Sequence, residues 1–128
     1  MPPIYLSDAS TYDYDEIPPG YYYQAMLKGP AVQRFWHTYK SREIARSIAE
    51  NSNVLDVGCG GGTFLYVLGQ SRKNIEAIGV DIAQAQIDFC AQTIAPQFHK
   101  ITFKKISAES LPFADASFDY VTSVQRQP

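Results

Sequence analysis

One stretch of eleven residues, NVLDVGCGGGT at positions 53–63, carries the residue types that could bind a ligand. A short apolar run with one carboxylate, Asp56, leads directly into a turn that contains Gly58, Gly60 and Gly62. Glycine lets backbone N–H groups approach a ligand closely, and a helix after such a turn presents unpaired donors at its N-terminus. The pattern therefore predicts a strand, a tight turn and a helix that together bind the polar, extended part of a ligand.

The glycine spacing distinguishes two kinds of nucleotide ligand. Dinucleotide-binding enzymes use G-x-G-x-x-G, but Thr63 stands at the third glycine position, which disfavours a nicotinamide-dependent oxidoreductase. The stretch fits G-x-G-x-G instead. Asp81 follows Gly60 by 21 positions and ends a second apolar run. A carboxylate there could accept hydrogen bonds from both ribose hydroxyls of an adenosine, or it could cap the next helix.

Hydrophobic periodicity predicts the elements that position these residues. Apolar runs at residues 53–57, 75–80, 101–106 and 118–124 indicate four strands. Three- and four-residue apolar steps predict helices at 30–50, at 64–68, ended by Gly69, and at 83–94, closed by Pro96. This alternation predicts a parallel sheet covered by helices, whose ligand lies beyond the carboxyl ends of the strands. The residues there are 58–62, Asp81 with Ile82, 107–109 and 123–125.

Four motifs in the right order and spacing give this chain a family resemblance. They are VLDVGCGGGT, the acid Asp81, SAESLPF at 107–113 and FADASFDYVTSV at 113–124. Over residues 53–124 the chain resembles the class I S-adenosylmethionine (SAM) dependent methyltransferases of the small-molecule branch. The resemblance implies a Rossmann-like three-layer α/β/α sandwich with a mostly parallel sheet of strand order 3-2-1-4, which is the N-terminal half of the class I fold.

The same resemblance implies S-adenosyl-L-methionine as the cofactor and assigns roles around it. Residues 58–62 would receive the methionine end, Asp56 would support the turn or the ammonium group, Asp81 would hold the ribose, and 107–109 would frame the adenine. Many relatives have Asp at the position of Ser107, and Asp119 could be purely structural within the fourth strand. The predicted cofactor-binding residues are Asp56, Gly58, Cys59, Gly60, Gly62, Asp81, Ile82, Ser107, Ala108, Glu109 and Gln125. The sequence identifies no catalytic base, and many relatives need none.

The ends of the chain depart from the family pattern. Class I methyltransferases continue beyond the fourth strand with a fifth strand, helices and a hairpin, whereas this chain ends four residues after residue 124. Lys100, Lys104 and Lys105 would protect the third strand as an outer edge, but the fourth strand would be exposed. We therefore expect a truncated product, an unstable fragment, or a homo-oligomer or partner chain that covers the fourth strand. Residues 1–29 are predicted to be an irregular arm, either a lid or a surface tail, and 30–128 the SAM-binding domain.

Composition limits the functional classes. The 128 residues are 45% hydrophobic and 19% charged, which is typical of a globular domain. The net charge of −2 gives no positive electrostatic field that would attract nucleic acid in general. No apolar run could span a membrane, and the cysteines and histidines show no metal-ligand spacing. Two cysteines without a pairing pattern indicate the cytoplasm. The predicted partner is a small-molecule methyl acceptor. The alternative is a catalytically silent SAM-binding or partner-subunit module.

Overall fold

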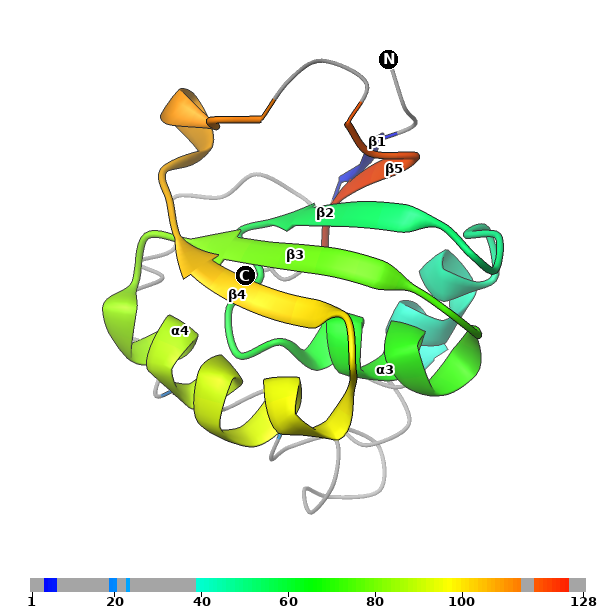
Figure 1. Cartoon of the computed structure of the whole chain (residues 1–128), viewed down its shortest axis with the longest axis horizontal. Helices are drawn as coiled ribbons and strands as arrows, with labels where there is room; N and C mark the ends of the chain where they lie inside the picture. Colours follow the sequence, from blue (N-terminus) through cyan, green and yellow to red (C-terminus); the bar gives the residue numbers. More distant parts are fainter. Residues whose placement is uncertain (1–3, 7–18, 21–22, 24–38, 114–116, 125–128) are drawn as a thin grey trace.

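A parallel sheet organises the computed structural model, which describes residues 4–6, 19–20, 23, 39–113 and 117–124 (Figure 1). Its central strands are β2 (Asn53–Val57), β3 (Glu76–Asp81), β4 (Ile101–Lys105) and β5 (Tyr120–Ser123). They lie in the order β4-β3-β2-β5, and every pairing is parallel. This is the predicted order 3-2-1-4, so the Rossmann-like arrangement is confirmed.

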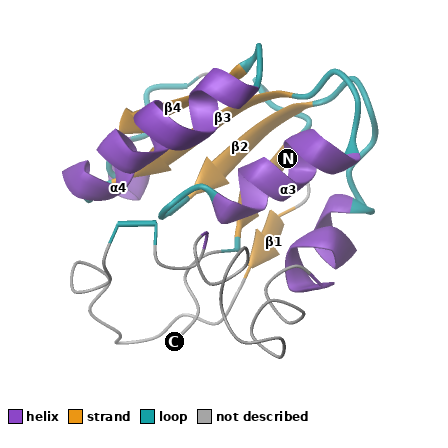
Figure 2. Ribbon diagram, turned by 90° about the horizontal axis from the view of Figure 1, so that it is seen from below, coloured by secondary structure: helices purple, strands orange, loops and turns teal. Residues whose placement is uncertain are grey.

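The main helices cover one face of this sheet (Figure 2). The helix α3 (Thr63–Ser71) connects β2 to β3, and α4 (Gln84–Phe89) connects β3 to β4 after continuing through η2 (Cys90–Ile94) and η3 (Ala95–Gln97). Both crossovers step in the same direction across the sheet. Right-handed connections that step in one direction place their helices on the same face, so two of the three predicted layers are present in the described residues.

The connection from β4 to β5 steps back past β3 and β2, so the same handedness carries it over the opposite face. It contains the short 3-10 helix η4 (Ala108–Ser110), which lies on the side away from α3 and α4 in Figure 1. The two faces of the sheet therefore have different covers.

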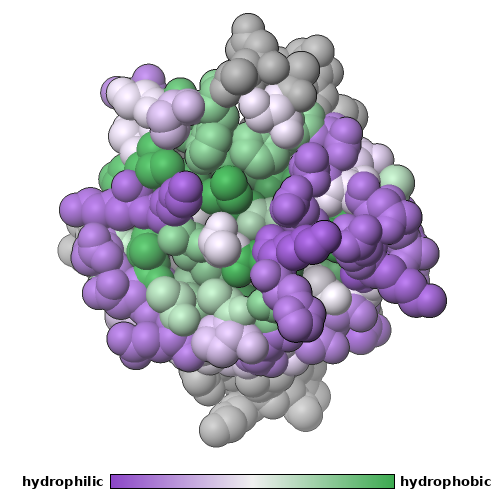
Figure 3. All heavy atoms as spheres, viewed as in Figure 1, coloured by the Kyte–Doolittle hydropathy of each residue, from purple (hydrophilic) through white to green (hydrophobic). Residues whose placement is uncertain are grey.

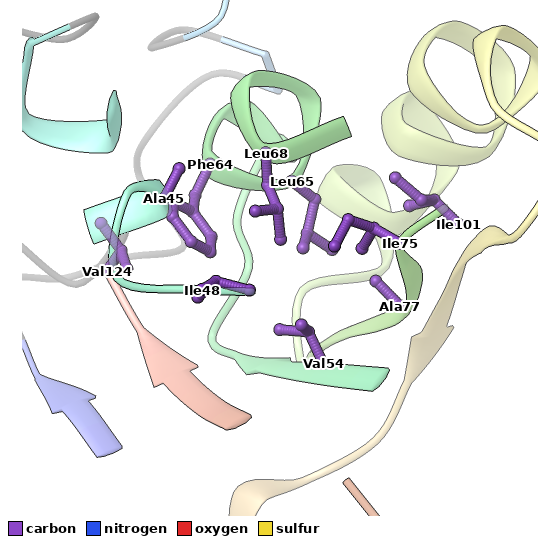
Figure 4. Close-up of a cluster of buried hydrophobic side chains, with 10 residues drawn as sticks. All are labelled: Ala45, Ile48, Val54, Phe64, Leu65, Leu68, Ile75, Ala77, Ile101 and Val124. Carbon is purple, nitrogen blue, oxygen red and sulfur yellow. The ribbon is translucent and has the colours of Figure 1, made fainter. Parts of the chain in front are cut away.

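The core lies between the sheet and the helices, as Figure 4 shows. Phe64, Leu65 and Leu68 of α3 pack against Val54, while Ala45 and Ile48 close one end of the cluster. Alternate strand residues point to the same face, so Val54 of β2 shares this face with Ala77 and Gly79 of β3, which are small. Each large side chain buried in this way contributes roughly 1.5–3 kcal/mol.

The opposite face carries a second set of apolar residues that is less completely covered. Val57, Ile78 and Val121 are only half-buried, and they alternate with the residues that point toward the helices. Figure 3 shows apolar side chains gathered at the centre of the face seen in Figure 1, with hydrophilic side chains around them.

The prediction that the fourth strand is exposed is wrong, because another strand of the same chain pairs with it. A short strand β1 (Ile4–Leu6) pairs in parallel with β5, with Ile4 opposite Val121 and Leu6 opposite Ser123. These three residues also correct the expectation of a wholly irregular arm. Three residues between prolines are too few for a periodic signal, and their pairing to a strand more than a hundred positions away leaves no local trace.

Other differences concern element ends. The helix α3 continues through Gly69 to Ser71, and the Phe98 ring packs so closely on Gly69 that an added Cβ would lie 2.5 Å from it. Of the helix predicted at 30–50, residues 39–45 are helical, and 30–38 lie outside the described residues. Tyr39, predicted on its apolar stripe, is 47% exposed.

Asp119 precedes β5 instead of lying inside it. Its Oδ2 accepts the N–H of Asn53 at 2.8 Å, and its own N–H donates to the carbonyl of Asn53 at 2.8 Å. These two bonds fix the start of the β2–β5 register, so the role of Asp119 in the described structure is structural.

Candidate functional site

The glycine turn after β2 has the backbone that its sequence predicts. Gly58, Gly60 and Gly62 have φ angles of 68°, 56° and 80°, in the left-handed region that favours glycine. The N–H groups of Gly58 and Cys59 donate to the Val80 carbonyl at 2.9 and 3.0 Å. Several amides of the turn are thus used to brace it against the end of β3, and the first turn of α3 has no side-chain cap.

Asp81 connects the two strand ends. Its Oδ2 accepts the N–H of Gly60 at 3.0 Å, and its Oδ1 accepts the N–H of Ala83 at 2.9 Å at the start of α4. The residue is 3% exposed. Bracing the turn and fixing Ala83, the residue before α4, are therefore roles that the structure gives this carboxylate. A carboxylate oxygen can accept more than one hydrogen bond, so the ribose contact stays a prediction.

Asp56 is fully buried beneath the turn. Its Oδ1 accepts the hydroxyl of Thr122 at 2.7 Å, while its Oδ2 has no partner among the described residues. Burial raises the pKa of Asp56 to about 7; the Thr122 hydrogen bond lowers it, and the charge of Asp81 raises it. A positive charge beside this carboxyl group would favour its ionised form and lower its pKa.

A second buried oxygen without a partner among the described residues belongs to Thr63, the first residue of α3. Thr63 stands where dinucleotide-binding turns have glycine, and its hydroxyl offers both a donor and an acceptor. Asp56 and Thr63 thus flank the glycine turn in sequence, each with one buried oxygen that has no partner among the described residues.

The two cysteines form the underside of the turn. Both are fully buried, and their Sγ atoms lie 3.7 Å (Cys59) and 3.2 Å (Cys90) from the Gly60 carbonyl oxygen. The hydrogen bond with Cys90 and then burial raise the pKa of Cys59 well above its usual range. The Cys59 thiol is therefore a buried group that packs against Gly60. Its raised pKa disfavours the thiolate, which nucleophilic chemistry would need.

The remaining predicted residues lie at the neighbouring strand ends. Ile82 is 50% exposed directly after Asp81, and the N–H of Ile106 donates to the Asp81 carbonyl at 3.1 Å. Residues 107–109 therefore begin beside Asp81, and all three are exposed. Ser107 uses its hydroxyl to accept the N–H of Glu109 at 3.2 Å. Gln125 lies outside the described residues, and the ligand contacts of this group stay predictions.

Sequence reasoning missed the hydroxyl partner of the buried acid. Within the run FDYVTSV, the side chain of Thr122 bonds Asp56. A threonine inside an apolar strand opposite a carboxylate-bearing strand is the signal that could have identified it.

The described residues also contain no group of three His, Cys, Asp or Glu side chains that could hold a metal ion. No helix in the described part of the chain has the length and apolar character to cross a membrane.

Comparison with known proteins gives the site its context. A family model described as a methyltransferase domain matches residues 54–127. The ubiquinone/menaquinone biosynthesis C-methyltransferase of Geotalea uraniireducens is 30% identical over 112 residues, which are 85% of this chain and 47% of that protein. The erythromycin 3''-O-methyltransferase of Saccharopolyspora erythraea is 32% identical over 83 residues, 63% of this chain and 27% of that protein. The chain thus spans less than half the length of either relative.

Solved structures show the same fold. The YcgJ protein of Bacillus subtilis superimposes with a TM-score of 0.60 at 26% identity, covering 66% of this chain and 37% of that one. The matched family model begins at Val54, inside β2, and includes the glycine turn, Asp81 and residues 107–109. All the predicted cofactor residues lie within the matched region. Those other than Gln125 also lie at or near the carboxyl ends of β2, β3 and β4.

Proposed function

Because this chain belongs to the methyltransferase family that its residues 54–127 match, we propose that it binds S-adenosyl-L-methionine across the carboxyl ends of β2 and β3 and transfers the methyl group to a small-molecule acceptor. The observation that carries the proposal is the Asp81 carboxylate, which joins the Gly60 turn to the start of α4. It places one acid at the meeting point of turn, strand end and helix.

The buried charges favour a cationic ligand. The open oxygen of Asp56, in a group whose pKa is raised to about 7, would accept the ammonium group, and the Thr63 hydroxyl lies at the helix start that would receive the carboxylate. Asp81 and the exposed side chain of Ile82 would meet the ribose and the adenine, together with residues 107–109. These contacts belong to the proposal.

The bound cofactor supplies a methyl group on a sulfonium, which is already a strong electrophile, so the protein's task is binding and orientation. The turn at residues 58–62 would hold the amino acid end, and its shape is fixed because its amides bond to Val80 and Asp81. Holding two reactants at near-attack distance and excluding water supplies most of the acceleration in such a transfer.

The named relatives differ in acceptor, since one is a C-methyltransferase and another an O-methyltransferase. Both names indicate small-molecule acceptors, and we extend that class to this chain. A cytoplasmic location and the absence of nucleic-acid or membrane partners belong to the same proposal. A homo-oligomer or partner chain is retained only as a proposal, because β1 already pairs the outer edge of β5.

A second candidate is a SAM-binding module without an acceptor pocket of its own. This chain spans 47% or less of the two curated relatives. The second candidate shares the cofactor site with the first candidate and differs only in turnover.

Isothermal titration calorimetry of the chain with S-adenosylhomocysteine and with NAD tests the proposal. We expect binding of the first and none of the second. Binding of S-adenosylhomocysteine without methylation of quinol, phenol or amine acceptors would favour the second candidate. A chain that binds neither nucleoside ligand contradicts both.

A further inference from the structure

Arginine side chains line a cleft at the opposite end of α3 from the glycine turn. The cleft has a volume of about 300 Å³, and its described lining residues are Arg42, Arg46, Ser71 and Arg72. Helix α3 begins at Thr63, beside the turn, and ends at Ser71. At about 1.5 Å per residue, roughly 13 Å of helix separate the cleft from the proposed cofactor site. The cleft is therefore a separate place in the fold.

Arg72 is held in a fixed orientation by two backbone carbonyl groups. Its Nε donates to the Ala45 carbonyl at 3.4 Å, and its Nη2 donates to the Arg46 carbonyl at 3.0 Å. These bonds join the end of the helix at 39–45, cyan in Figure 1, to the end of α3. A guanidinium group has five N–H donors, so the bonds to the carbonyls leave Arg72 able to donate to a ligand as well.

Arg42 and Arg46 add two further positive charges to the cleft. They are four positions apart, a spacing that brings helical side chains together and makes like charges repel each other. Arg46 Nη1 pairs with Glu43 at 3.0 Å, and Arg42 has no ion pair with a described residue. One acid therefore compensates one of the three arginines among the described residues, and an anion in the cleft would relieve the remaining repulsion.

The positive charge continues beyond this cleft. Arg72 also lines a second cleft, of about 280 Å³, together with Lys100 and Asn74 at the start of β4. The Nζ of Lys100 donates to the Asn74 Oδ1 at 3.4 Å, which directs the ammonium group toward this end of the sheet. Cations gathered around a concave surface raise the local concentration of anions. The ligand expected here is therefore negatively charged.

The lining residues favour phosphate oxygens over other anionic groups. Guanidinium groups bind phosphate through paired, charge-assisted hydrogen bonds, and the Ser71 hydroxyl offers a further donor. A volume of about 300 Å³ corresponds to roughly ten water molecules at about 30 Å³ each, which gives room for two linked phosphate groups. We propose that this cleft binds the diphosphate group of a small ligand through Arg42, Arg46 and Arg72. The inference does not depend on the proposed function, because the two sites share no residue.

The test is calorimetric titration of the full chain with inorganic pyrophosphate at constant ionic strength. Arg42→Gln should raise the Kd about tenfold, because the ligand loses one charged hydrogen-bond donor. Lys73→Gln is the matched control: it removes the same charge from an exposed neighbour of Arg72 that is not among the described lining residues of either cleft. This control should change the Kd by less than about twofold. Arg46→Gln should also weaken binding, and it keeps the test open if Arg42→Gln does not fold.

A second titration separates this cleft from the glycine turn. With S-adenosylhomocysteine at saturation, the Kd for pyrophosphate should stay the same, and competition between the two ligands would overturn the inference. A wild-type chain that binds no pyrophosphate would overturn it too, as would equal weakening in Arg42→Gln and Lys73→Gln. Binding of phosphatidylglycerol vesicles without binding of pyrophosphate would assign the arginines to a lipid surface and likewise overturn it. A chain that binds pyrophosphate but no S-adenosylhomocysteine contradicts the proposed function alone.

Discussion

At the scale of single residues, the site depends on two acids in different states. Asp81 has both oxygens bonded to backbone N–H groups, whereas Asp56 has one open oxygen and a pKa raised to about 7. The first is suited to hold the turn in one shape. The second is suited to respond to a positive charge placed beside it, because such a charge restores the ionised form.

The Asp56 assignment predicts a pH dependence of stability. Its folded-state pKa of about 7 lies above the value of 3.8 for an unperturbed carboxyl group, so its contribution is full below pH 3.8 and is lost as the pH rises through 7. Each pH unit in that window removes at most about 1.4 kcal/mol. In urea denaturation, the difference in unfolding free energy between wild type and Asp56→Asn should shrink by about 2 kcal/mol from pH 5 to pH 8. A difference that stays constant would show that Asp56 is ionised in the folded state.

Asp81→Ala should weaken S-adenosylhomocysteine binding by about tenfold or more, because the Gly60 and Ala83 N–H groups lose their acceptor and the ribose loses a predicted one. Calorimetry of the variant measures this directly. Asp88→Ala is a suitable control, since Asp88 is an exposed acid on the same helix α4. Unchanged affinity in Asp81→Ala would remove the ribose role and leave only the bonds to the Gly60 and Ala83 N–H groups.

At the scale of elements, the approach of α3 to the sheet is set by glycine in a strand. An added Cβ at Gly79 would lie 2.7 Å from Phe103 and 3.0 Å from Leu65, a fully buried residue of α3. Thr63 occupies the place where dinucleotide-binding turns use glycine for close helix–strand packing. In this chain, Gly79 of β3 is a position where the lack of a side chain allows α3 to approach the sheet closely.

Gly79→Ala should therefore destabilise the fold by about 1–3 kcal/mol through overpacking. Equilibrium denaturation measures the loss as a lower midpoint with an unchanged slope. Glu76→Ala, at an exposed position of the same strand, should change stability by less than about 0.5 kcal/mol. Equal stabilities for the two variants would show that α3 can move away from β3 without cost.

At the scale of the whole molecule, two surfaces of the sheet are only partly covered by the described residues. β1 covers the edge of β5 with only three residues, and the face seen in Figure 3 carries half-buried apolar side chains. All-parallel sheets are normally covered on both faces. Lys104 and Lys105 lie exposed on the other outer strand, where charge discourages edge pairing.

Deleting residues 1–6 should expose the β5 edge and promote self-association. Size-exclusion chromatography with light scattering should show a mass that rises with concentration for the deletion variant and rises less for the 128-residue chain. Identical masses at every concentration would mean that β1 does not protect this edge.

The sequence by itself determined the parts whose causes are local. Glycines at alternate positions after an apolar run define the turn, and hydrophobic periods place β2, β3, β4 and β5 within two residues of their observed ends. The family motifs then gave the strand order and the set of predicted cofactor residues. These features survive without tertiary information because backbone geometry and side-chain alternation act over a few residues.

Only the tertiary structure decided what depends on distant partners. It paired Ile4–Leu6 with β5. It formed the hydrogen bonds of Asp56 with Thr122 and of Asp81 with Gly60. It also placed Gly20 and Gln86 next to Gly61. Each contact joins residues that are remote in the chain, and its worth comes from burial and from satisfying polar groups that the chain alone leaves undetermined. The role of a carboxylate as brace, cap or ligand acceptor is set by which N–H groups the fold brings to it.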